Sequence, residues 1–286
     1  MKNNNTSRQL SFDEYKNKID ELISTKKIDK LKLQEDYFDI CGNYWIVDKY
    51  IACGGSFNEE LTPNTLETYN QAINEGYALA IPVRMLDDEN IVCFAHQNIS
   101  KVIPTTSGYL KKLTLPEVKE LKLNDNGDKI PTLSEALDFI AGRTPVIIEI
   151  INDGMVEKFE DKVISILQKY ITEYDCYENV AIMSINPHTL EYFFNHYPYV
   201  TRILKSGNFK DKMYGSFKTT KLKKLKFYKI THADFICYGN ELLPSRVIKK
   251  HKPVGVIAHN VTNQNQYISV AEHCDNIIFK NFKPTI

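Results

Sequence analysis

The sequence has no excess of charge of either sign: Lys and Arg together number 36, and Asp and Glu together also number 36. This balance argues against bulk electrostatic attraction to nucleic acid or to an anionic membrane surface. No apolar run approaches the roughly eighteen residues that a membrane-spanning helix needs, so no transmembrane segment is expected. Residues 1–20 are polar and lack the apolar core of a signal peptide, which favours a cytoplasmic protein.

Cysteine pairs with the spacing of a metal site or redox motif are also missing. The six cysteines are scattered along the chain, and none of them forms a C-x-x-C pair. Most lie in apolar, strand-like runs, where a buried reduced thiol is expected rather than a disulfide or a zinc ligand. Neither a disulfide framework nor a zinc site is therefore predicted.

What the chain does contain is ordinary globular material, because 43% of its 286 residues are hydrophobic and 25% are charged. Its length suits one TIM (β/α)8 barrel with an additional N-terminal segment. We assign residues 1–47 to a helical extension and residues 48–286 to the barrel. In the extension, Ile19, Leu22 and Ile23 recur at helical spacing among alternating charges. This spacing predicts one or two solvated helices that pack on the barrel and close its bottom.

From residue 49 onward, short β-branched runs alternate with helical stretches, a pattern typical of parallel strands joined by crossover helices. Eight runs suggest a closed barrel rather than an open doubly wound sheet, and no G-x-G-x-x-G follows the first run. The expected barrel strands are Tyr50–Cys53, Tyr77–Val83, Val146–Ile151, Val180–Ile185, Val200–Lys205, Ala233–Tyr238, Val254–His259 and Asn276–Phe279.

Helix signals separate these runs. Asn64 is expected to cap a helix over residues 65–75 that ends before Gly76. Thr132 and Glu135 predict a capping box, and Pro187 predicts the first turn of a further helix.

One run breaks the alternation of strand and helix. Ile91–His96 follows the second strand after a turn-like cluster of acidic and amide residues, a connection too short for a helix. We therefore predict an antiparallel hairpin strand, which would direct His96 toward the barrel mouth.

Barrel enzymes place their chemistry at the carboxyl ends of the strands, and here those positions hold few catalytic groups. Glu149 is the one acid inside a strand whose side chain could point inward, and it follows Val146-Ile147-Ile148. A carboxylate in such a run is costly unless it is paired, hydrogen-bonded or bound to a metal. Two interpretations of Glu149 stay open: a functional acid, or an acid paired with a nearby lysine or backbone donors.

Three further residues at strand ends are weaker candidates. His96 and His259 each end a strand, where a histidine is more often structural or simply exposed than catalytic. Cys53 could serve as a nucleophile beside a base, but a small buried thiol is favoured because no local motif supports the chemistry.

Over residues 50 to 282 the sequence resembles the glycerophosphodiester phosphodiesterase family. The run I-A-C-G-G-S-F followed by T-P-N-T-L-E-T-Y resembles the family's opening, in which His-Arg-Gly ends the first strand and Glu-Asn-Thr begins the first helix. L-T-L-P-E-V-K-E-L-K-L, I-P-T-L-S-E-A-L-D-F-I and V-I-I-E-I-I resemble its middle segments. The resemblance implies a TIM barrel and, for active members, hydrolysis of phosphoric diesters in lipid and glycerol-phosphate metabolism.

The same resemblance implies a site in which two histidines act as acid and base and three carboxylates hold a divalent metal. Most of these residues are replaced here. Cys53 and Gly54 stand where the family has its first histidine and the neighbouring arginine, and Pro63 stands where it has its first glutamate. Ile81 and Val83 replace two acids of the second strand, and Gln97 replaces a further acid. Ile151 replaces a lysine and His259 replaces a tryptophan. The second histidine is kept as His96 and the third metal ligand as Glu149.

Two functions from different classes follow from this pattern. In the first, the protein is a catalytically inactive pseudoenzyme, a binding or regulatory module for a small polar or phosphorylated ligand near His96, Glu149 and Asn64, with Cys53 and His259 as further binding residues. In the second, it remains an active phosphoric diester hydrolase that uses His96 and Glu149. No cofactor is expected in the first case, whereas Mg or Ca is expected in the second.

Residues 210–229 add a possible interaction surface, because they hold eight lysines and one acid. A solvent-exposed helix face explains this composition, and a binding surface for an acidic partner is the more specific alternative.

Overall fold

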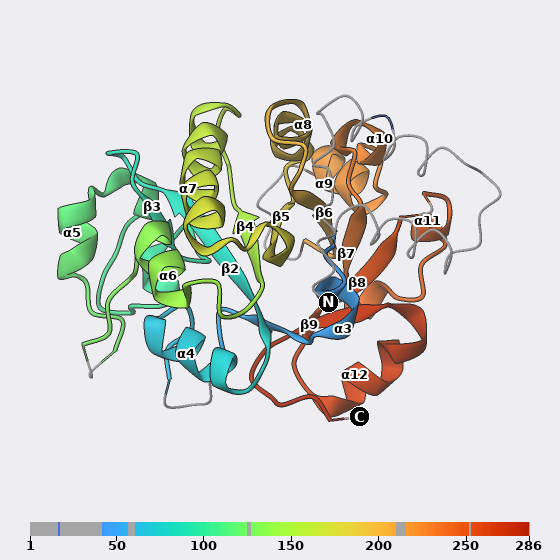
Figure 1. The fold of residues 1–286 in the computed structure, drawn as a ribbon, viewed down its shortest axis with the longest axis horizontal. Helices are drawn as coiled ribbons and strands as arrows, with labels where there is room; N and C mark the ends of the chain where they lie inside the picture. Colours follow the sequence, from blue (N-terminus) through green and yellow to red (C-terminus); the bar gives the residue numbers. More distant parts are fainter. Residues whose placement is uncertain are drawn as a thin grey trace, which may run out of the picture.

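The computed structural model describes residues 42–56, 61–124, 127–209, 216–251 and 253–285, together with Asn17 and, for residues 216–218, the backbone only. In these ranges eight parallel strands form a closed barrel, in the order β1-β9-β8-β7-β6-β5-β4-β2, and pairing of β1 with β2 closes it (Figure 1). The barrel strands are β1 (Ile51–Cys53), β2 (Ala78–Met85), β4 (Val146–Ile150), β5 (Val180–Ser184), β6 (Thr201–Ser206), β7 (Phe235–Gly239), β8 (Gly255–Val261) and β9 (Asn276–Phe279). Each predicted strand run is confirmed to within two residues, and so is the closed barrel.

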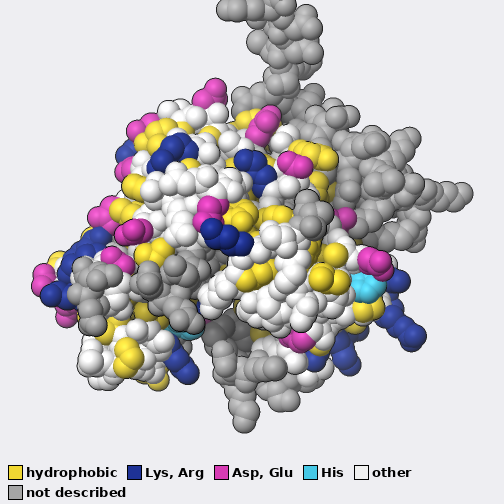
Figure 2. Space-filling model, turned by 90° about the horizontal axis from the view of Figure 1, so that it is seen from below, with side chains coloured by type: hydrophobic (Ala, Val, Ile, Leu, Met, Phe, Trp, Pro, Cys, Tyr) yellow, Lys and Arg dark blue, Asp and Glu magenta, His cyan; other side chains and the backbone are white. Residues whose placement is uncertain are grey.

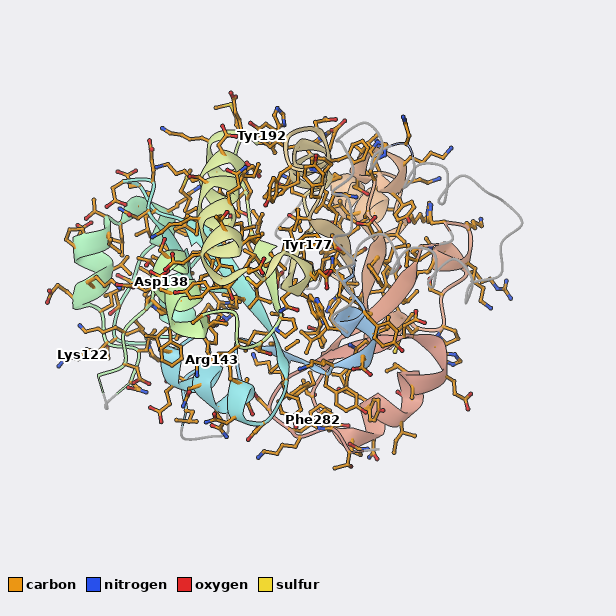
Figure 3. The ribbon with its side chains drawn as sticks, in the orientation of Figure 1. Lys122, Asp138, Arg143, Tyr177, Tyr192 and Phe282 are labelled. Atoms are coloured by element: carbon orange, nitrogen blue, oxygen red, sulfur yellow. The ribbon has the colours of Figure 1, made fainter. Side chains whose placement is uncertain are left out.

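Helices surround the barrel and cover its outer face (Figure 1). Neighbouring helices are also linked at their surfaces, as where Tyr192 donates a hydrogen bond to Asp161 Oδ1 at 2.7 Å (Figure 3). The helices of four or more residues in this layer are α4 (Leu66–Asn74), α6 (Leu133–Ile140), α7 (Lys158–Tyr174), α8 (Pro187–His196), α9 (Ser216–Lys223), α10 (Tyr228–Thr231), α11 (Arg246–Lys249) and α12 (Gln264–Val270).

The predicted helix signals are confirmed with one exception. Thr132 and Glu135 form a capping box at α6, and Pro187 is the first residue of α8. The prediction that Asn64 caps α4 is wrong, because Thr65 is the N-cap and its hydroxyl accepts from the Thr68 amide. Asn64 instead adopts a left-handed conformation with φ of 65°, which an N-cap residue does not use.

The predicted hairpin is also confirmed, although its strand ends at Cys93 and not at His96. β3 (Ile91–Cys93) pairs antiparallel with β2, in the register Val83 with Cys93 and Met85 with Ile91. The segment after it, which contains α5 (Leu115–Glu120), has a small hydrophobic cluster of its own and lies at the opposite end of the molecule from α11 (Figure 1). This segment therefore has a hydrophobic core separate from the barrel interior.

Alternation along the strands separates the barrel interior from the layer beneath the helices. One buried cluster contains Ala78 and Ala80 of β2, Ile147 of β4 and Ile203 of β6, and it fills the barrel. A second cluster contains the intervening strand residues together with residues of the helices. By this alternation Glu149 and Lys205 point into the barrel.

The bottom of the barrel is closed by α3 (Trp45–Asp48). Trp45 and Ile46 belong to the interior cluster, and Trp45 Nε1 donates to the Glu178 carbonyl at 2.8 Å. Asn276 Nδ2, at the start of β9, donates to the Ile46 carbonyl at 2.7 Å. The remaining part of the predicted extension, including Ile19, Leu22 and Ile23, lies outside the described residues.

The distribution of charge on the surface agrees with the equal numbers of acidic and basic residues in the sequence (Figure 2). On the face drawn in Figure 2, acidic and basic side chains of the described residues are interspersed with apolar ones. Among the described residues, no helix is both long and apolar enough to cross a membrane. Cys53, Cys93, Cys176, Cys237 and Cys274 are free thiols, as predicted for them.

Candidate functional site at the barrel mouth

An ion pair between Glu149 of β4 and Lys205 of β6 lies inside the barrel near its mouth. The distance between Lys205 Nζ and Glu149 Oε1 is 2.5 Å, and the two side chains are 20% and 8% exposed. Burial lowers the pKa of Lys205, but the negative charge of Glu149, with smaller effects of Cys53 and Cys237, outweighs it and raises the pKa above its ordinary value. Lys205 therefore stays charged. Of the two interpretations of Glu149 that the sequence left open, the structure agrees with the acid paired with a lysine.

The groups around this pair are kept neutral. Burial raises the pKa of Cys53 despite the opposing effect of Lys205, and burial also raises the pKa of Cys237. Burial and the charge of Lys205 lower the pKa of His259, whose Nε2 donates to the Ser206 carbonyl at 2.7 Å. A protonated thiol is a poor nucleophile, so the arrangement does not activate Cys53.

The loop after β1 is built on two glycines in the left-handed region. Gly54 has φ of 72° and Gly55 has φ of 95°, and a side chain at Gly55 would lie 2.6 Å from the Thr68 backbone. The Asn64 amide donates to the Gly54 carbonyl at 2.7 Å, which brings Asn64 to the mouth. Its side-chain Oδ1 is buried without a hydrogen-bond partner.

The second strand presents different residues to the barrel from those that the resemblance suggested. The resemblance placed two metal-binding acids at Ile81 and Val83, which would therefore line the cavity, but both residues are fully buried in the cluster beneath the helices. The inward positions near the mouth are Pro82 and Arg84, and Pro82 lies beside Glu149 in register. The expectation is wrong because a one-residue displacement along a strand moves every side chain to the other face.

Arg84 introduces a buried cation at the mouth. Its side chain is 8% exposed, and Nη1 donates to Asp153 Oδ2 at 3.0 Å in the loop after β4. Nη2 donates to the Ala95 carbonyl at 3.4 Å, whereas Nε is buried without a partner. Arg84 and Asp153 were not identified from the sequence. The sequence signal was the alternation of small Ala78 and Ala80 with larger Leu79 and Ile81, which indicates the inward face of β2.

The structure pairs Glu149 with Lys205, and His96 is not a member of this ion pair. His96 follows β3, is exposed, and packs edge-to-face with Phe94 at 6.4 Å between ring centroids. Its assignment as a catalytic residue therefore stays a prediction, as do the binding roles of Asn64, Cys53 and His259.

A groove of about 790 Å³ lies beside the mouth, between the β2–β3 hairpin and the loop that leads from β4 to α7. Arg84 and Ile151 contribute to its lining, and so does Gln97. The volume is within the range of ligand-binding cavities. A separate cavity that borders Glu149 measures about 10 Å³, which is enough for at most one water molecule.

The residues around Glu149 do not fit a divalent metal ion. Mg and Ca take several oxygen ligands, whereas the residues beside Glu149 in register are Pro82 and Met183. One oxygen of Glu149 is already bound to the Lys205 ammonium group. Nowhere in the described ranges do three or more His, Cys, Asp or Glu residues gather in a group suited to a metal.

Comparison with known proteins places this barrel in a family. The model of the glycerophosphoryl diester phosphodiesterase family matches residues 54–267. The chain therefore belongs to the glycerophosphoryl diester phosphodiesterase family. None of the curated proteins with which the sequence was compared matched it.

Solved structures of similar fold include a phosphodiesterase and two glycerophosphodiester phosphodiesterases. A phosphodiesterase from Oleispira antarctica, in complex with the product sn-glycerol-3-phosphate, has a TM-score of 0.65 and 17% identity, covering 84% of this chain and 95% of the other. An enzyme from Parabacteroides distasonis has a TM-score of 0.64 and 17% identity, with coverages of 82% and 92%. One from Thermotoga maritima has a TM-score of 0.60 and 18% identity, with coverages of 80% and 93%.

Proposed function

We propose that this protein is a family member that has lost metal-dependent diester hydrolysis and serves as a binding or regulatory module. The observation that carries the proposal is the Glu149–Lys205 ion pair, since it commits the one carboxylate that the resemblance identifies as a kept metal ligand. The inward residues of β2 near that carboxylate are Pro82 and Arg84, neither of which can coordinate a hard cation. A mouth that cannot hold a metal ion lacks the group that, by the resemblance, polarises the phosphodiester.

The test is an assay of the full chain with glycerophosphocholine and a chromogenic phosphodiester in the presence of Mg, Ca or Mn. We expect no turnover above that of a buffer blank. Turnover that depends on added metal and disappears in the His96→Ala variant would establish the active hydrolase instead. His188→Ala is the matched control, because the His188 side chain is exposed on α8 and pairs with Glu191 three residues away.

The groove beside the mouth supports a ligand-binding role. Its volume suits a small organic molecule, and the Arg84–Asp153 ion pair holds two of its walls together. A small polar or phosphorylated ligand matches the buried donors of Arg84. The product sn-glycerol-3-phosphate, bound by the structural neighbour from Oleispira antarctica, is a suitable first probe.

A thermal shift on adding sn-glycerol-3-phosphate, lost in Arg84→Met, would support this role. The absence of a shift with this and other small phosphate esters would count against it. Lys119→Met is the control, because it removes a lysine that does not line the groove and that pairs with Glu135.

A second binding surface is supported by a separate observation. Lys226, Lys229 and Lys250 all lie close enough to His251 to lower its pKa, in addition to the larger effect of burial. This basic cluster lies partly in the Lys-rich segment, of which residues 210–215 are outside the described ranges. An acidic partner would bind here with an affinity that falls as salt rises, and salt-independent binding would exclude the surface.

A further inference from the structure

The position of Lys205 relative to Glu149 follows from the register of the strands. Glu149 lies beside Met183 of β5, and Met183 lies beside Ile203 of β6. Lys205 is two residues beyond Ile203, so it points into the barrel one inward position nearer the mouth than Glu149. The greater exposure of Lys205 agrees with this order. Lys205 therefore approaches Glu149 from the side of the mouth, and it is the more exposed member of the pair.

The ammonium group has capacity beyond its bond to Glu149. A lysine carries three N–H donors, and the one hydrogen bond described for Lys205 goes to Glu149 Oε1. Its positive charge is also felt by Cys53, Cys237 and His259, whose pKa values all respond to it.

We propose that the Lys205 ammonium group occupies the place beside Glu149 that a divalent metal ion would need. An oxyanion in the mouth then binds to this ammonium group without a metal. A divalent ion at Glu149 would have to displace the ammonium group from 2.5 Å or lie beside it against charge repulsion. The inference rests on the proposed function for the existence of a ligand, and it adds the cation that the ligand contacts.

The experiment measures the binding of inorganic phosphate to the full chain by thermal shift, first in EDTA and then with Ca or Mn. We expect phosphate to stabilise the wild-type protein in EDTA, and we expect added metal to leave the apparent Kd unchanged. Lys205→Met should weaken phosphate binding at least tenfold, whereas Lys205→Arg should retain it because the positive charge is kept. Phosphate binding that is absent in EDTA, or that appears only with metal, would overturn the proposal.

Glu149→Gln provides a second variant in case Lys205→Met does not fold. It keeps the ammonium group and removes the charge that competes with phosphate, so binding in EDTA should be retained or tightened. Weaker binding in Glu149→Gln would contradict the proposal, because a metal-held anion depends on the carboxylate. Diester hydrolysis that persists in EDTA would remove the proposed function yet leave the assignment of Lys205 intact, so the two failures can be told apart.

Discussion

The bottom and the mouth of this barrel differ in how they satisfy their buried polar groups. At the bottom, Arg202 and Asp234 are fully buried and form a salt bridge, and Arg202 also donates to the carbonyls of Pro198, Val200 and His232. At the mouth, Asn64 Oδ1, Arg84 Nε and His259 Nδ1 are buried without hydrogen-bond partners. The fourth atom of this kind among the described residues is the hydroxyl of Tyr69 in α4, the helix that follows the mouth loop.

The paired polar groups at the bottom and the unpaired ones at the mouth indicate that the two ends of the barrel have different roles. Barrels keep the bottom for stability and the mouth for binding and chemistry. Buried polar groups are normally paired, so unpaired ones at the mouth indicate a site that is completed by a ligand or water. Although the residues that the resemblance assigns to catalysis are mostly replaced, the mouth keeps buried polar atoms without partners.

The largest expected effect comes from breaking the satisfied network at the bottom. Asp234→Ala leaves the Arg202 guanidinium buried without its counter-charge, and we expect a loss of about 3–5 kcal/mol of unfolding free energy. Urea denaturation measures it. Lys119→Met is the control, because the Lys119–Glu135 pair is largely exposed and should contribute much less. Equal losses in the two variants would contradict the assigned role of the bottom network.

A smaller effect is expected from Trp45→Phe, which keeps an aromatic ring in the barrel but removes its N–H donor. The Glu178 carbonyl then loses its partner, and the expected loss is about 1–3 kcal/mol. Tyr109→Phe, at an exposed aromatic residue, should leave the denaturation midpoint nearly unchanged. A midpoint equal to wild type in Trp45→Phe would show that α3 does not anchor the barrel bottom.

At the mouth, His259 should make stability depend on pH. Its pKa is lowered in the folded protein, so below the ordinary value of about 6.5 the unfolded chain binds more protons than the folded one. Stability should therefore fall as the pH decreases from 7 toward 5, and His259→Gln should flatten this slope. The exposed His188→Gln variant should keep it. A slope that is the same in His259→Gln and wild type would exclude this contribution.

The smallest effect, and the one of opposite sign, is expected for Asn64→Gly. Glycine adopts the positive φ of this position freely and removes the unpartnered Oδ1, so unfolding free energy should stay level or rise by up to about 1 kcal/mol. Asn263→Gly is the matched control, because Asn263 is extended and caps α12, and it should not stabilise the protein. A clear loss of stability in Asn64→Gly would mean that the mouth loop is as well satisfied as the bottom.

By itself the sequence determined the barrel, its eight strands, the hairpin after the second strand and the caps at Thr132 and Pro187. These features follow from local signals, namely β-branched runs, glycine punctuation and capping residues, which act over a few neighbouring positions. It also singled out Glu149, because an acid inside an apolar strand has to be compensated.

Only the tertiary structure decided what compensates that acid and which residues face it. Lys205 is 56 positions away and reaches Glu149 across β5, a contact that depends on the stagger of strands around the barrel. The inward face of β2 carries Pro82 and Arg84 in place of Ile81 and Val83, since facing depends on strand register and a single residue reverses it. The ion pair at the mouth is a consequence of barrel closure, which no local pattern encodes.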